Sequence, residues 1–266
     1  MSAGDSVESI NLHRSRPRLP GLRRAPTPID PHPPTTLVNL SAAGTAPAAP
    51  ADPGRLATLT YAVVDVETTG GSPWYGHRVT EIAAVVVRRG RIAECFETLV
   101  NPERSIPPYI TRLTHITQDM VRDKPTFRDV CPEVTRVLRG HVFVAHNASF
   151  DWRFVTAEVG RAGGMLEVAR QMCTVRLARR LLPHLRRRSL DYVAHHYGVP
   201  IAQRHRAMGD ALATAHCLVR LLEDAGARGL DTWDDLSRVL SARTAAARRR
   251  RRRSALPASG EWELGA

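Results

Sequence analysis

The fold is decided by the stretch Leu59-Thr-Tyr-Ala-Val-Val-Asp-Val-Glu-Thr-Thr-Gly70. Its first half is short and rich in β-branched residues, which predicts a buried strand. Asp65 and Glu67 stand two residues apart at the end of that strand. Because alternate residues of a strand share a face, both carboxylates point the same way, roughly 7 Å apart at their Cα atoms. Two acids on an otherwise apolar strand are costly unless something neutralises them; alternatively, the strand has ended and water solvates both.

The segments that follow predict a mixed sheet. Further strands are expected at 79–88, 92–100 and 141–145, with a hairpin turn at Arg89-Gly90-Arg91. Apolar residues at helical spacing predict helices over 127–138, 149–159, 175–182, 189–197, 207–223 and 233–240. Pro132 must sit in a first turn or at a kink. Strands first, then helices around at least one more strand, indicate an α/β or α+β domain.

The ends of the chain differ from its middle. The chain has 266 residues, and ten of its 19 prolines fall within the first 55. Such a segment buries too little apolar surface to offset the cost of ordering, so a disordered arm is predicted over 1–55. A basic tail over 241–266 contains six consecutive arginines, Arg248 to Arg253, and is predicted to stay extended. The folded domain is expected at 56–240.

Composition excludes several classes of protein. No run of about 18 apolar residues is present, which excludes a membrane-spanning helix, and no secretory signal is expected at the first residues. The four cysteines lie far apart with no paired spacing. This argues against a zinc knuckle or a disulfide framework and is typical of the reducing cytoplasm.

A third acid, Asp151, and a fourth, Asp210, follow later in the chain. Asp151 lies just past the strand 141–145, where a helix dipole alone would favour an acid. Five helical residues turn through about 500°, so His205 and Asp210 share a site only if the helix begins near Ala207. His205 would then lie on the preceding loop, and a mobile histidine beside a fixed carboxylate suits a general base.

The four acids Asp65, Glu67, Asp151 and Asp210 are carried by three separate elements. If they converge, they cannot all stay ionised without cations. Mg²⁺ or Mn²⁺ are the natural neutralisers, and two ions about 4 Å apart would form the clamp used for in-line phosphoryl displacement. Zinc fits less well, because the cluster offers one histidine and no cysteine.

Three ordered segments carry a family resemblance over roughly residues 58–225. Val64-Asp-Val-Glu-Thr-Thr-Gly70, His146-Asn-Ala-Ser-Phe-Asp151 and His205-Arg-Ala-Met-Gly-Asp210 resemble the three motifs of the DEDDh exonuclease superfamily. This superfamily includes the proofreading epsilon subunit of bacterial DNA polymerase III and its stand-alone relatives. Leu113-Thr-His-Ile-Thr117 is similar to the family's Leu-Thr-Gly-Ile-Thr, with His115 in place of the glycine.

The resemblance implies an α/β, RNase H-like fold with a five-stranded mixed sheet flanked by helices. It implies that Asp65, Glu67 and Asp210 hold the metal that activates water, that Asp65 reaches a second ion supported by Asp151, and that His205 accepts the water's proton. The implied substrate contacts are Thr68, Thr69, Gly70, His115 and Phe150, with free donors and hydroxyls at the Thr68-Thr69-Gly70 turn; Phe150 is equally explained as a core anchor. Glu81 also matches a family position, although a polar residue on one sheet face explains it equally well.

The expected function is metal-dependent 3′–5′ exonuclease activity on single-stranded ends, in proofreading or repair, with DNA favoured over RNA. A cytoplasmic, nucleoid-associated bacterial protein is expected, with a DNA polymerase as a candidate partner and no membrane. The alternatives are a non-catalytic nucleic-acid-binding or replisome-scaffold module, supported by the basic tail, and an RNA-trimming exoribonuclease. Preference for DNA or RNA depends on contacts to one 2′-hydroxyl and cannot be read from these motifs.

Overall fold

The computed structural model describes residues 54–241, together with the backbone of Val38–Asn39. Apart from these two residues and residues 54 and 55, the expected arm over 1–55 lies outside the described residues. So does the expected basic tail, apart from residue 241. Both therefore stay predictions.

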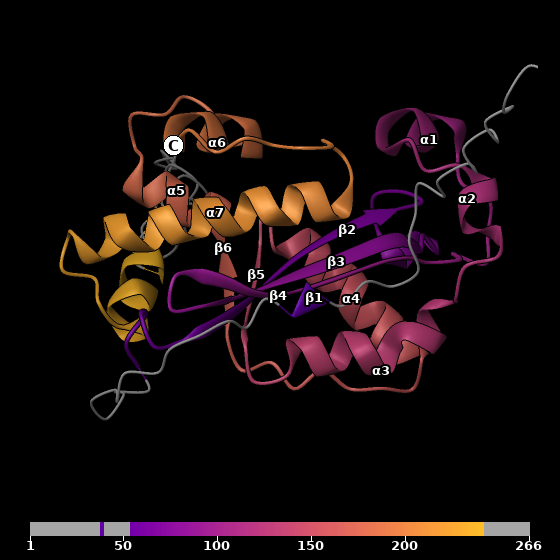
Figure 1. The fold of residues 1–266 in the computed structure, drawn as a ribbon, viewed down its shortest axis with the longest axis horizontal. Helices are drawn as coiled ribbons and strands as arrows, with labels where there is room; N and C mark the ends of the chain where they lie inside the picture. Colours follow the sequence, from indigo (N-terminus) through magenta and orange to yellow (C-terminus); the bar gives the residue numbers. More distant parts are fainter. Residues whose placement is uncertain (1–37, 40–53, 242–266) are drawn as a thin grey trace, which may run out of the picture. The chain divides into compact units, whose positions relative to one another are not determined.

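Within the described residues, six strands form one sheet in the order β1-β4-β3-β2-β5-β6 (Figure 1). The strands are β1 (Val38–Asn39), β2 (Thr60–Thr68), β3 (Val79–Arg88), β4 (Arg91–Leu99), β5 (Val142–Ala145) and β6 (Gln171–Cys173). β2, β3 and β4 form an antiparallel meander, whereas β5 and β6 run parallel to β2. The five strands β2 to β6 confirm the predicted mixed sheet, and β1 adds two residues at its edge.

The β3–β4 hairpin closes as the sequence predicts. Arg89 and Gly90 both have positive φ, 51° and 71°, which is the backbone of the two-residue turn that matches the twist of paired strands. Glycine adopts this conformation without steric cost, and Gly90 occupies the second position of the turn.

The described helices are α1 (Pro108–Thr114), α2 (Gln118–Arg122), α3 (Phe127–Leu138), α4 (Ser149–Arg161), α5 (Thr174–Leu181), α6 (Leu190–Tyr197), α7 (Ala207–Gly226), the 3-10 turn η1 (Pro73–Tyr75) and a helix over 233–241. The predicted helices from 127 onward are confirmed to within a few residues. Pro132 lies inside α3 and not in its first turn. No helix among the described residues has the length and apolar character needed to cross a membrane. All four cysteines are free, as predicted.

β2 separates two apolar cores. Tyr61 and Val63 face α5, α6 and α7 on one side of the sheet, and Ala62, Val64 and Val66 face α3 and α4 on the other (Figure 1). Asp65 and Glu67 continue the row of Tyr61 and Val63, because side chains alternate along a strand. Both carboxylates therefore point to the face that α7 covers, at the end of the strand where α7 begins.

Candidate active site

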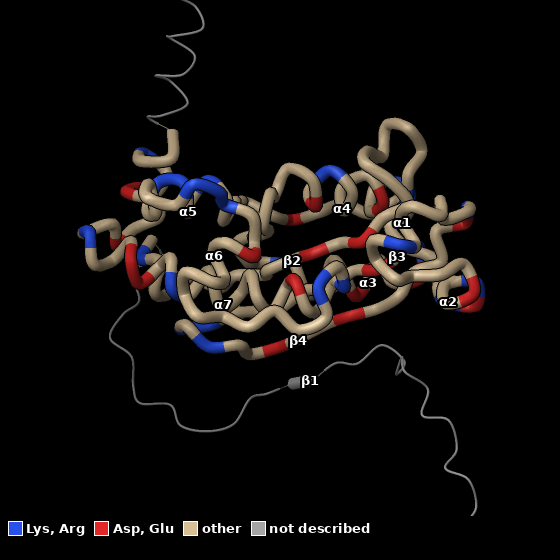
Figure 2. Tube along the Cα trace, turned by 90° about the horizontal axis from the view of Figure 1, so that it is seen from above, with Lys and Arg blue, Asp and Glu red and all other residues tan. Residues whose placement is uncertain are grey.

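The two acids of β2 lie in a crowded, poorly solvated place. Burial raises the pKa of Asp65 well above its usual range, and the nearby carboxylates of Asp151, Glu67 and Asp210 raise it further. Burial also raises the pKa of Glu67 to about 8, with Glu81 and Asp210 adding to the shift. Because a neighbouring charge shifts a pKa only at short range, these effects indicate that Asp151, Glu67 and Asp210 lie near Asp65. Figure 2 shows acidic positions along β2 and β4, and Lys and Arg gathered over α5.

Asp151 is brought to β2 by the parallel pairing of β5. Val63 of β2 lies opposite Val144 of β5, so both strands end at the same edge of the sheet. Asp151 stands in the first turn of α4, just past that edge, and its Oδ1 accepts a hydrogen bond from the Val66 amide at 3.3 Å. Its side chain is buried, and burial raises its pKa.

α7 begins at Ala207, which confirms the prediction that His205 lies on the preceding loop and Asp210 in the first turn. Potential ligand atoms of Glu67, His205 and Asp210 all lie within 4.8 Å of one another. His205 has φ 63° and Gln203 has φ 51°. This left-handed conformation is uncommon for residues other than glycine and is often found at functional sites.

Gly209 allows this loop to pass close to α7. A Cβ atom at Gly209 would overlap the carbonyl oxygens of Ala202 and Gln203. Gly209 is not among the residues predicted from the sequence, although a glycine inside a helical pattern is a known sign of close packing. Gly209 therefore fixes the path of the loop that carries His205.

The two carboxylate oxygens of Asp210 differ in their hydrogen bonding. Its Oδ2 accepts hydrogen bonds from the Arg204 guanidinium and, at 3.2 Å, from the His205 amide. Its Oδ1 is buried and has no hydrogen-bond partner among the described residues. Burial raises the pKa of Asp210, while the Arg204 charge lowers it. A buried, unpaired carboxylate oxygen is costly, and a cation would remove that cost.

Glu81 joins the start of α7 to β3, which the sequence alone does not reveal. Its carboxylate is fully buried and pairs with Arg206, whose Nε lies 3.1 Å from both oxygens. It also accepts the Ala207 amide at 2.8 Å. Because Arg206 follows His205 directly, this ion pair fixes the position of the loop as well as the helix.

The hydroxyls of the Thr68-Thr69-Gly70 turn form hydrogen bonds with nearby backbone groups. Thr68 Oγ1 donates to the Gly70 carbonyl at 2.7 Å, and Thr69 Oγ1 accepts the Arg78 amide at 3.0 Å. Both threonines are buried, so the expectation of free hydroxyls at this turn is wrong. A Cβ atom at Gly70 would overlap the ring of His77, which explains the glycine.

The described contacts of His115 lie within its own segment, whereas Phe150 packs against the core on the α3 and α4 side of the sheet. His115 is the C-cap of α1, with φ 59°. Because glycine is favoured in this left-handed position, the family glycine has a conformational explanation, and histidine is among the residues that tolerate it. Phe150 is half-buried and its ring centroid lies 5.0 Å from that of Phe154, which supports the interpretation as a core anchor.

Comparison with known proteins decides the family. The model of the RNase T exonuclease family matches residues 62–218, which is more than half of the chain. The chain belongs to this exonuclease family. The match confirms the predicted resemblance, and the chain is a 3′–5′ exonuclease of the DEDDh type.

Two curated relatives of this exonuclease are bacterial. The present chain is 37% identical over 186 residues to DNA polymerase III PolC-type from Staphylococcus saprophyticus, and the match covers 70% of this chain and 13% of the relative. It is 39% identical over 163 residues to the 3′-5′ exonuclease DinG of Bacillus subtilis, covering 61% of this chain and 18% of that relative. The chain thus spans less than a fifth of the length of either relative.

Solved structures confirm the fold. Exonuclease X in complex with 5′ overhanging duplex DNA has 30% sequence identity and a TM-score of 0.53, covering 68% of this chain and 99% of that one. E. coli Exonuclease I in complex with a dT13 oligonucleotide has 17% identity and a TM-score of 0.56, covering 64% of this chain and 42% of that one. The second likeness shows the fold alone.

Proposed function

We propose that this exonuclease removes nucleotides from single-stranded 3′ ends by a two-metal mechanism, with DNA favoured over RNA. The observation that carries the proposal is the convergence of Asp65, Glu67, Asp151 and Asp210 at the point where β2 ends and α4 and α7 begin. Hydrolysis of a phosphodiester requires neutralisation of charge on the phosphate, and four clustered carboxylates are a typical site for the cations that provide it.

The residues fit two Mg²⁺ or Mn²⁺ ions. The donor set consists of hard oxygen atoms, which these ions prefer, and the buried Oδ1 of Asp210 lacks any other described partner. Asp65, Glu67 and Asp210 would hold one ion, and Asp65 and Asp151 the other. When bound, such ions lower the pKa of a water molecule and stabilise the charge on the leaving oxygen.

His205 is the proposed general base. It lies on a loop at the edge of the carboxylates, half-buried and near Glu67 and Asp210. From there its ring would accept the proton of the attacking water. The proposed substrate contacts are the backbone at Thr68, Thr69 and Gly70, together with His115 and Phe150 beside the terminal nucleotide.

The test follows the shortening of oligonucleotides labelled at one end. A 5′-labelled single strand should yield a ladder of products only with Mg²⁺ or Mn²⁺, and Asp65→Ala should abolish it. Asp234→Ala, at an exposed acid in the first turn of the helix over 233–241, is the matched control. Cleavage that persists in Asp65→Ala, or that needs no divalent ion, would refute the proposal.

The substrate and the partners need their own measurements. Matched DNA and RNA oligomers should be turned over at different rates, with DNA faster; faster turnover of RNA would favour the RNA-trimming alternative. Co-purification with a replicative polymerase would support a proofreading role, which the similarity to a PolC-type polymerase suggests. Salt-sensitive binding without cleavage would instead favour the scaffold module.

A further inference from the structure

Two aromatic side chains of the loop between β2 and β3 stand exposed in the described structure. Trp74 is 87% exposed and Tyr75 is 81% exposed, and both belong to η1, which has no buried residue. Single exposed apolar residues are ordinary, but two adjacent large rings are not. Aromatic rings exposed in this way are typical of interaction sites.

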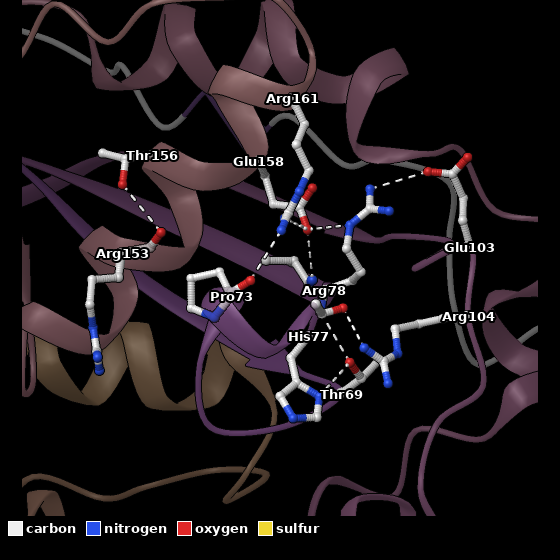
Figure 3. Close-up of polar contacts among 12 residues, drawn as sticks. Thr69, Pro73, His77, Arg78, Glu103, Arg104, Arg153, Thr156, Glu158 and Arg161 are labelled. Atoms are coloured by element: carbon white, nitrogen blue, oxygen red, sulfur yellow. Dashed lines mark hydrogen bonds and ion pairs between the residues drawn. The ribbon is translucent and has the colours of Figure 1, made fainter.

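The backbone that carries the rings is fastened at both ends. Ser72 caps η1 through a hydrogen bond to the Trp74 amide, and Gly76 ends it with φ 73°. The Arg161 guanidinium, from α4, donates to the Pro73 carbonyl at 3.3 Å, and Arg104 donates to the Gly76 carbonyl (Figure 3). The rings are therefore presented on an ordered turn, which reduces the entropy lost when a partner binds.

The buried carboxylate of Glu158 holds the end of the same loop at Arg78 and Val79. Glu158 of α4 is 1% exposed and accepts the Arg78 Nε at 2.7 Å and the Val79 amide at 3.2 Å (Figure 3). At the other end of the loop, the ring of His77 lies against Gly70. The loop that bears the rings thus begins at the turn that follows Asp65 and Glu67. Trp74 lies seven positions after Glu67, which limits the distance between their Cα atoms to about 25 Å.

The surroundings of the rings are basic. Arg104 and Arg161 donate to carbonyls of the loop, while Arg78 pairs with Glu103 and Glu158 (Figure 3). Glu158 also pairs with Arg161 at 3.4 Å. Three guanidinium groups against two carboxylates leave an excess of positive charge, to which exposed Arg153 of α4 adds. Aromatic rings interleaved with arginine are the pattern that binds single-stranded nucleic acid by stacking and phosphate contact.

We propose that Trp74 and Tyr75 form a stacking platform for bases of the single strand upstream of its 3′-terminal nucleotide, with Arg104 and Arg161 near its phosphates. This inference rests on the proposed function, because it assumes that the strand ends among the four carboxylates. The platform binds the part of the strand that is not being cleaved. It therefore acts on long substrates and leaves the hydrolysis of a single nucleotide unchanged.

The first test measures binding in the full chain carrying Asp65→Ala, to prevent cleavage. Anisotropy of a labelled oligothymidylate should show about tenfold weaker binding for each of Trp74→Ala and Tyr75→Ala. Trp74→Phe, which keeps a ring, should lose less. Met165→Ala removes an apolar side chain that is 80% exposed outside the loop and should bind as the parent does. If Trp74→Ala and Tyr75→Ala bound the oligothymidylate as tightly as Met165→Ala does, the proposal would be overturned. The exposed rings would then be assigned to contact with a protein instead.

The second test separates this inference from the proposed function. In the active chain, Trp74→Ala should raise KM for the long oligonucleotide about tenfold while kcat stays the same. Hydrolysis of the p-nitrophenyl ester of thymidine monophosphate, which has no upstream base, should not change. If Trp74→Ala lowered kcat/KM equally for both substrates, the proposal of a stacking platform would be wrong. If the parent chain hydrolyses neither substrate, the proposed function fails, and the binding measurement still decides the platform.

Discussion

The substitution Glu67→Gln should stabilise the metal-free protein at pH 8. Glu67 lies among other acids, and burial together with Glu81 and Asp210 raises its pKa from 4.5 to about 8. The folded chain therefore binds a proton that the unfolded chain releases above its own pKa. Stability consequently falls as the pH rises from about 4.5 to about 8, because the folded state binds more protons in that range. Glutamine removes the ionisable group and with it this loss.

The size of the effect follows from the shift. One pKa unit corresponds to about 1.4 kcal/mol, so the 3.5 units between 4.5 and about 8 would give about 4.8 kcal/mol without screening. Glu67 is half-buried, and water screens part of the repulsion. The expected gain in unfolding free energy is about 2 kcal/mol at pH 8, and close to zero at pH 5, where the buried carboxyl is already protonated.

Urea unfolding with a chelator present measures this gain. Glu67→Gln is compared with the parent chain at pH 5 and pH 8, and Glu223→Gln, at an acid whose side chain is 58% exposed, is the control. A gain that is equal at both pH values, or no larger than that of the control, would refute the claim that burial and the neighbouring carboxylates disfavour the ionised form of Glu67. Destabilisation at pH 8 would refute it as well.

Three further predictions follow from the site. Binding of Mn²⁺ should release protons from the carboxyl groups, so the rise in Tm on adding Mn²⁺ should grow between pH 5 and pH 8. Calorimetry in buffers of different ionisation enthalpy measures the number of protons released. A rise in Tm that does not depend on pH would contradict the prediction. His115→Gly should raise the unfolding free energy by about 1 kcal/mol in urea, because φ 59° strains a residue with a side chain; a loss would contradict the strain. Gly209→Ala should lower the free energy by about 1–3 kcal/mol and reduce kcat, because the new methyl group displaces the loop that carries His205. Unchanged stability and kcat would show that the loop tolerates the methyl group.

The parts of the fold that the sequence predicts are those with strong local patterns. The β3–β4 hairpin combines β-branched runs with a glycine turn, and α7 carries a long apolar rhythm. β6 has three residues, Gln171–Cys173, and forms a strand only because β5 offers it a parallel edge. α1 and α2 are too short for helical periodicity to be recognised.

The site likewise contains residues that sequence motifs reveal and residues that they do not. The acids and His205 can be found from ordered motifs, because the residue types needed for metal chemistry recur at fixed spacing. The role of Glu81 cannot, since its partner Arg206 lies 125 residues away in the sequence. The engagement of the Thr68 and Thr69 hydroxyls cannot be predicted either, because the sequence does not reveal that the backbone of Gly70 and Arg78 hydrogen-bonds them.

The convergence of the four carboxylates around paired cations is tested most directly by anomalous diffraction from crystals of the full chain grown with Mn²⁺. Two anomalous peaks about 4 Å apart are predicted, bounded by Asp65, Glu67, Asp151 and Asp210. Absence of any peak within about 2.5 Å of a carboxylate oxygen of Asp65 or Asp210, in crystals where Mn²⁺ is in excess, would contradict the account.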